Sequence, residues 1–135
     1  AQILANAQVL ATAADILGTP AYRAAAIESM DYLLGRNGIG QSYVTGYGTQ
    51  FSQNQHSRWF AHARDRRLPH PPHGALAGGA NSGLQDPVMQ SRFGATPCAP
   101  QLCYVDDIDA YSVNEIAINW NAGLAAMATW MALQR

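Results

Sequence analysis

Apolar residues recur every three or four positions at the start of the chain, which predicts an amphipathic helix over residues 1–17. Its apolar face consists of Ile3, Leu4, Ala7, Leu10, Ala11, Ala14 and Leu17. Gly18 is the expected C-cap, and Thr19 and Pro20 then form a start signal for a second helix. That helix has an apolar face made of Tyr22, Ala26, Met30 and Leu33. Gly35 is expected to end it, and because the connection is so short, the two helices should pack antiparallel.

A third amphipathic pattern predicts a helix over residues 113–133. Its apolar stripe consists of Ile116, Trp120, Leu124, Met127 and Met131. The other sides carry small residues: Ala117, Gly123, Ala125, Ala126 and Ala128. Small residues on several sides predict close packing against neighbouring helices rather than a solvated outer face.

Between these helices, residues 36–112 show no sustained period and contain most of the glycines and all but one of the prolines. Strand-like pieces are short, as at residues 42–45. So long a stretch without regular structure is unusual in a compact domain. It indicates either a large functional loop system or supporting helices that lie outside this chain.

Composition narrows the class of protein. Charged residues make up only 13% of the 135 residues, about half the usual level of roughly 25%, so much of the surface must be uncharged or covered. The net charge of −1 gives no reason to expect nucleic acid or an anionic membrane surface as a partner. No apolar run approaches the ~20 residues of a membrane span, and no signal peptide is visible. The chain starts inside a helical pattern, which is typical of truncation or processing.

Carboxylates crowd the sequence just before the last helix. They belong to Asp106, Asp107, Asp109 and Glu115, and Tyr104 and Tyr111 are interleaved with them. One interpretation is helix capping, with Asn114 as the N-cap and Glu115 at the positive end of the helix. Another is acid–base chemistry, because a carboxyl group kept protonated by nearby like charges can act as a general acid. Calcium binding is a third, although the spacing does not match an EF-hand loop.

A second group of functional residue types lies within residues 53–60. His56 and Arg58 can donate hydrogen bonds to hydroxyl or carboxylate oxygens, and Trp59 presents a flat apolar face. This combination suits a sugar ring, which has polar edges and an apolar face. The alternative is a loop held to its scaffold by Arg58, with Trp59 and Phe60 packed in the core.

Two cysteines, Cys98 and Cys103, flank a turn-like segment. Their spacing predicts a local disulfide if the protein is exported, and two free thiols are the alternative.

Four segments of the chain together resemble glycoside hydrolase family 9, the inverting β-1,4-glucanases. Residues 31–37 resemble the end of a family helix, 42–58 the first family signature, 74–79 a common loop and 104–122 the second signature. The resemblance implies an all-α fold in which residues 1–135 supply the last helices and loops of an (α/α)6 barrel. It covers the C-terminal part of a single catalytic domain.

The resemblance also implies the role of individual residues. Glu115 corresponds to the catalytic general acid, and Asp106 and His56 to the active-site residues that accompany it. Arg58 corresponds to a residue that binds substrate hydroxyls. Trp120 stands where the family usually has a tyrosine that lines the cleft.

The chain departs from the family pattern in three places. Gln50 stands where a basic residue or asparagine is usual, and Gln55 where proline or an aliphatic residue is usual, so the local loop shape is expected to differ. An inverting glycosidase also needs a second carboxylate, roughly 6.5–9.5 Å from the acid, that activates water. The family supplies it from an Asp-Ala-Gly-Asp-like motif near the start of the domain, and the sequence contains no such motif.

The sequence therefore predicts the C-terminal portion of a secreted endo-β-1,4-glucanase that is inactive without its upstream segment. The expected partners are a β-1,4-glucan or cellodextrin and the N-terminal remainder of the domain, with no nucleic acid and no membrane. No cofactor is required, and no ligand set for the calcium that is common in the family can be assembled. Two alternatives are a non-catalytic carbohydrate-binding remnant of the same scaffold and a self-contained three-helix interaction domain.

Overall fold

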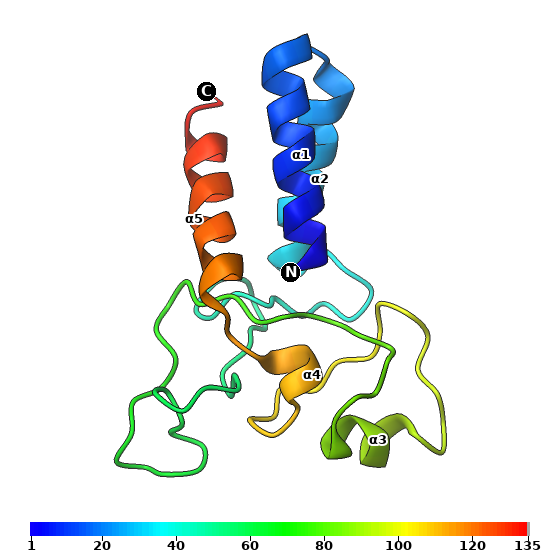
Figure 1. The fold of residues 1–135 in the computed structure, drawn as a ribbon, viewed down its shortest axis with the longest axis vertical. Helices are drawn as coiled ribbons and strands as arrows, with labels where there is room; N and C mark the ends of the chain where they lie inside the picture. Colours follow the sequence, from blue (N-terminus) through cyan, green and yellow to red (C-terminus); the bar gives the residue numbers. More distant parts are fainter. Residues whose placement is uncertain (135) are drawn as a thin grey trace.

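The computed structural model describes residues 1–134, in which three long helices stand side by side and the loops gather at one end of them (Figure 1). In chain order the helices are α1 (Gln2–Leu17), α2 (Pro20–Leu33), α3 (Pro87–Phe93), α4 (Tyr111–Asn114) and α5 (Ile118–Ala132). Within the described residues, β-structure is limited to isolated bridges such as the one between Val44 and Leu76. The all-α class predicted from the sequence is confirmed.

The first two helices form as the sequence predicts. Gly18 ends α1 in the left-handed conformation, with φ of 64°, and its N–H donates to the Ala14 carbonyl at 2.9 Å. Thr19 is extended and Pro20 is the first residue of α2. The α1 helix packs against both α2 and α5. The α2 helix ends at Leu33, two residues before the glycine expected to end it.

The last helix is shorter than predicted. The periodicity predicts a helix over residues 113–133, but α5 begins at Ile118, and the chain is extended at Glu115 and again at Ala117. Ala117, not Asn114, is the N-cap of α5, so the capping interpretation of the acidic run is wrong. The helix cannot start earlier because the backbone before it hydrogen-bonds to two distant loops.

A main core forms where the long helices meet the loops. Its helical members are Leu4, Ala7, Ala11, Ala26, Met30, Leu33, Leu124 and Met127. Its loop members are Tyr43, Val44, Leu76 and Ala77. A second, smaller core consists of Met89, Cys103, Ala110 and Val113 and lies under the acidic run. The loops are therefore ordered by apolar contacts of their own as well as by the helices.

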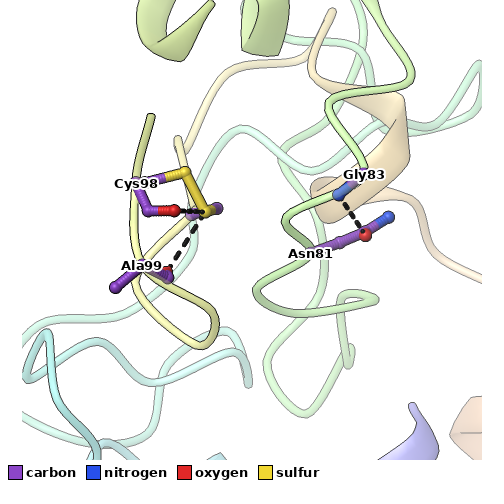
Figure 2. Close-up of a disulfide and its surroundings, with 5 residues drawn as sticks. Asn81, Gly83, Cys98 and Ala99 are labelled. Atoms are coloured by element: carbon purple, nitrogen blue, oxygen red, sulfur yellow. Dashed lines mark hydrogen bonds between the residues drawn. A yellow bond between two sulfur atoms is a disulfide. The ribbon is translucent and has the colours of Figure 1, made fainter. Parts of the chain in front are cut away.

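Cys98 and Cys103 form a disulfide, with their Cα atoms 5.4 Å apart (Figure 2). Cys103 is completely buried, and its carbonyl accepts a hydrogen bond of 3.0 Å from the N–H of Asn81. The Asn81 side chain in turn accepts from the Gly83 N–H at 2.9 Å (Figure 2). The disulfide and these contacts fix the segment that leads directly into Tyr104.

Several large apolar side chains on the helices face outward. Val9, Ile16, Leu17, Ile118 and Leu133 are between 63% and 91% exposed. A groove of about 490 Å³ also lies along α5, lined mainly by apolar residues of α5, of the loops and of the C-terminal end of α2. Exposed apolar area of this kind is more than isolated surface residues and is typical of an interaction surface. No helix in the described part of the chain is long and apolar enough to span a membrane.

Candidate active site

The site lies where the loops that carry His56 and Gly78 meet the short extended segment between α4 and α5. The His56 N–H donates to the Asn114 carbonyl at 2.8 Å, and the Ile116 N–H donates to the His56 carbonyl at 3.3 Å. On the other side, the Gly78 N–H donates to the Glu115 carbonyl at 3.0 Å. The backbone of Glu115 is therefore held between two loops, while its side chain is exposed.

Asp106 lies in the same cluster, with its carboxylate held by nitrogen donors. One oxygen accepts from the Asn54 N–H at 3.0 Å and from the Asn114 side-chain amide at 3.1 Å. The other oxygen accepts from the Gln53 N–H at 2.9 Å. N–H donors that converge on a carboxylate fix its orientation. The three predicted site residues, Glu115, Asp106 and His56, are thus brought together by one network.

The His56 ring is oriented by contacts on two sides. Its Nδ1 lies 2.6 Å from the Ile108 carbonyl, which can only accept, so Nδ1 carries a proton and donates. The ring also packs against Tyr111, with centroids 5.9 Å apart and planes at 60°. Fixing Nδ1 as a donor leaves Nε2 to interact with a ligand.

The loop that follows His56 presents its side chains to solvent. Trp59 is 81% exposed, so the interpretation of this tryptophan as a core residue is wrong, and Phe60 is half-buried. The Ser57 hydroxyl accepts from the Trp59 N–H at 3.2 Å, which fixes the turn that carries the ring. Arg58 is exposed, and within residues 1–134 its guanidinium makes no hydrogen bond or ion pair.

Gln55, a departure from the family pattern, is completely buried and joins three loops. Its Oε1 accepts from the Thr45 hydroxyl at 2.9 Å, and its Nε2 donates to the Ala75 carbonyl at 2.8 Å. Because both ends of the amide are paired, the burial of this polar side chain is compensated. Gln55 therefore fixes the chain immediately before His56.

Trp120 is half-buried and packs against the backbone beside the site. A methyl group added at Gly78 would come within 3.3 Å of the Trp120 ring. The ring thus supports the loop whose N–H binds the Glu115 carbonyl, and it belongs to the apolar surroundings of the main core.

The two remaining aspartates of the acidic run are engaged locally. Asp107 accepts from the Asp109 N–H at 2.8 Å, and Asp109 forms an ion pair with Arg64 of the long loop. Among residues 1–134, no group of three His, Cys, Asp or Glu side chains is placed to hold a metal ion.

Asp86 supports the site and was not singled out from the sequence. It is completely buried, caps α3 through a 2.8 Å hydrogen bond from the Met89 N–H, and accepts from the Ser112 N–H of α4 at 3.0 Å. Burial opposes its ionisation, but hydrogen bonds from Ser112 and Met89 outweigh this, so the pKa of Asp86 lies below its ordinary value. The Asp86-Pro87 pair was the available signal, since it reads as an N-cap followed by proline at the first helical position.

The three long helices, with the carboxylate cluster on the loops at one end, match part of the (α/α)6 barrel of a glycoside hydrolase. Residues 1–128 match the family model for glycosyl hydrolase family 9, and the chain belongs to this family.

The relatives are much longer than this chain. Endoglucanase C of Cellulomonas fimi is 51% identical over 135 residues, which cover 98% of this chain and 12% of that protein. The cellulose 1,4-beta-cellobiosidase of Acetivibrio thermocellus is 42% identical over 130 residues, covering 96% and 14%. The crystal structure of the family 9 endoglucanase J30 superposes with a TM-score of 0.82 at 34% identity, covering 96% of this chain and 23% of that one. The chain thus spans less than a quarter of these relatives and forms part of the barrel.

The lowered pKa of Asp86 predicts a pH-dependent contribution to stability. Because the carboxylate is favoured in the folded state, its contribution is present above the unfolded pKa of about 3.9 and is lost as the pH falls through the lower folded value. In the complete domain, Asp86→Asn replaces one accepting oxygen by an amide nitrogen that cannot accept from Ser112 or Met89, so it should lower the free energy of unfolding at pH 7 by about 1–3 kcal/mol. The difference from the parent should shrink in acid, as measured by thermal unfolding from pH 7 to pH 3. Asp107→Asn is the control, and a difference independent of pH would contradict the assignment.

Proposed function

We propose that the chain is the C-terminal segment of a single family 9 catalytic domain that hydrolyses β-1,4-glucosidic bonds of cellulose or related β-glucans with inversion. The observation that carries this proposal is the exposed carboxylic side chain of Glu115, on a backbone held by His56 and Gly78 beside the oriented carboxylate of Asp106. The printed names of the relatives, an endoglucanase and a cellobiosidase, support the substrate class.

In the proposed reaction, Glu115 is the general acid. It protonates the glycosidic oxygen as the bond from that oxygen to the anomeric carbon breaks, so the departing sugar leaves as an alcohol. A base carboxylate from the upstream segment takes a proton from water on the opposite face of the ring, and the resulting hydroxyl bonds to the anomeric carbon. Asp106 and His56 accompany the acid within the same network.

Substrate contacts are proposed for the loop after His56. The free guanidinium of Arg58 and the Nε2 of His56 can hydrogen-bond to sugar hydroxyls. The exposed ring of Trp59 can cover the apolar face of a pyranose. Trp120, which packs against Gly78 next to Glu115, is proposed to line the substrate cleft, as the tyrosine at this position does in the family.

The rest of the domain is proposed to cover the outer helical faces. The chain accounts for 12% and 14% of the two curated relatives, and large apolar side chains of α1 and α5 are exposed in its absence. The disulfide Cys98–Cys103 supports a secreted, extracellular protein, since disulfides persist in oxidising compartments.

The general-acid assignment is tested with Glu115→Gln in the complete domain. The substitution keeps the shape of the side chain but removes its acidic proton, so kcat on a β-1,4-glucan should fall by roughly 10²–10⁴-fold. Cellodextrin binding, measured by calorimetry, should persist. Glu28→Gln, on the exposed surface of α2, is the matched control and should leave the rate of reducing-end release unchanged. Near-normal turnover by the Glu115 variant would show that another group is the acid.

The role of the exposed tryptophan is tested with Trp59→Ala and Trp59→Phe in the complete domain. Removing an aromatic surface that contacts a sugar should weaken cellohexaose binding roughly tenfold, whereas phenylalanine should retain much of the affinity. Calorimetric titrations of both variants measure this. Equal affinities for the parent and Trp59→Ala would remove Trp59 from the binding site.

The need for the upstream segment is tested with the isolated 135-residue chain. Without the second carboxylate it should not hydrolyse carboxymethylcellulose, and addition of the upstream segment should restore release of reducing ends. Measurable hydrolysis by the isolated chain would contradict the proposal that the base lies upstream.

A further inference from the structure

Asn114 is the only asparagine of the site whose side chain is completely buried and bonded at both ends. Its Oδ1 accepts from the Tyr104 hydroxyl at 2.6 Å. Its Nδ2 faces three acceptors, the Asn54 carbonyl at 2.8 Å, an Asp106 carboxylate oxygen at 3.1 Å and the Asp107 carbonyl at 3.2 Å. Only an amide fits this position, because one end must accept and the other must donate.

The backbone of Asn114 belongs to the site as well. Its carbonyl accepts from the His56 N–H at 2.8 Å, and its peptide bond leads directly into Glu115. One residue therefore contacts the backbone of His56, the carboxylate of Asp106 and the chain that carries Glu115.

We propose that Asn114 is a positioning residue that holds the Asp106 carboxylate at a fixed distance and orientation from Glu115 and His56. This inference rests on the proposed function, because it concerns the same reaction. Asn114 itself reaches no substrate, since it is completely buried, and it acts through Asp106 and through the backbone. Site residues must be held within a fraction of an ångström, which requires a support whose own side chain cannot move.

Tyr104 supplies the second half of this support. Burial raises the pKa of Tyr104 far above its ordinary value, so the phenol remains protonated and continues to donate to Asn114. The titratable side chains that contact Asn114 are Tyr104 and Asp106, whereas Asp107 contacts it through its backbone carbonyl. Glu115 is adjacent in the chain, and His56 lies across the backbone pair. A negative charge placed at Asn114 would therefore lie closest to Asp106.

Asn121 provides a matched control on α5. Its Oδ1 accepts from the Leu76 N–H at 2.7 Å, and its Nδ2 donates to the Leu76 carbonyl at 3.2 Å and to the Ala117 carbonyl at 3.0 Å. It is an amide that joins a loop to a helix as Asn114 does, but none of these bonds reaches a carboxylate. Substitutions at Asn121 therefore measure the effect of losing a loop-to-helix amide contact that does not involve Asp106.

The first test compares Asn114→Ala with Asn121→Ala in the complete domain. Loss of the support should lower kcat on a soluble β-1,4-glucan roughly 10- to 100-fold for Asn114→Ala, with KM changed much less. The melting temperature of each variant measures the loss of stability separately. Equal losses of kcat in the two variants at equal stability would overturn the proposal.

The second test uses charge. In Asn114→Asp, the new carboxylate and that of Asp106 lie about 3 Å apart and repel, so one of the two holds a proton to higher pH. The acid limb of the profile of kcat against pH should therefore move toward neutral by roughly one pH unit or more. Asn121→Asp should leave that limb in place. An unmoved limb in Asn114→Asp would contradict the proposal. If this variant does not fold, Tyr104→Phe removes the hydroxyl that donates to Asn114 and pairs with Ser52. It should lower kcat several-fold with KM retained, and an unchanged kcat is the contrary result.

A parent domain that releases no sugar from any β-1,4-glucan would contradict the proposed function rather than the role of Asn114. The contact between Asn114 and Asp106 is then tested without an activity assay. The free energies of unfolding are measured in a double-mutant cycle of Asn114→Asp and Asp106→Asn. A coupling between the two positions at pH 7 that disappears at pH 3 supports the contact, and its absence at both pH values overturns it.

Discussion

Buried polar groups must be hydrogen-bonded, and this constraint organises the loop end of the molecule. Residues 36–112 contain little regular structure, so side chains provide the partners that a helix or sheet would otherwise supply. Gln55 joins three loops, Asp86 connects α3 to α4, and Asn114 joins the acidic run to the loop before His56. Each of these side chains is completely buried. The loops are consequently held by a few specific bonds rather than by a continuous ladder.

This constraint also explains why the proposed acid lies between two helices. A helical Glu115 would use its peptide groups within the helix, whereas the extended conformation frees them for distant loops. The carbonyl of Glu115 accepts from Gly78, and the residues on either side of it pair with His56. The helical pattern is interrupted where the site is assembled, and the interruption brings together segments almost sixty residues apart in the chain.

Local signals predicted the elements that are determined locally. The apolar period, Gly18 and the Thr19-Pro20 pair were sufficient for α1 and α2, because helix capping depends on neighbouring residues. The start of α5 was wrong because the partners of that backbone come from remote loops, which periodicity cannot register. Residue chemistry singled out the acidic run and the segment around His56, and the family resemblance then implied the individual roles. The supporting contacts of Gln55 and Asp86 depend on long-range geometry and emerge only from the structure.

The shape of the site and the completion of the barrel are physically connected. The site network rests on α5 and the loops, and α5 in turn packs against α1. The other faces of these helices expose residues such as Ile16 and Ile118, whose burial would contribute on the order of 2 kcal/mol each. Hydrogen bonds fix the positions of Asp106 and Glu115 relative to each other. Hydrophobic burial against the rest of the domain can fix both residues relative to the base that is proposed to lie on another segment. The two kinds of interaction therefore determine different distances within the proposed catalytic centre.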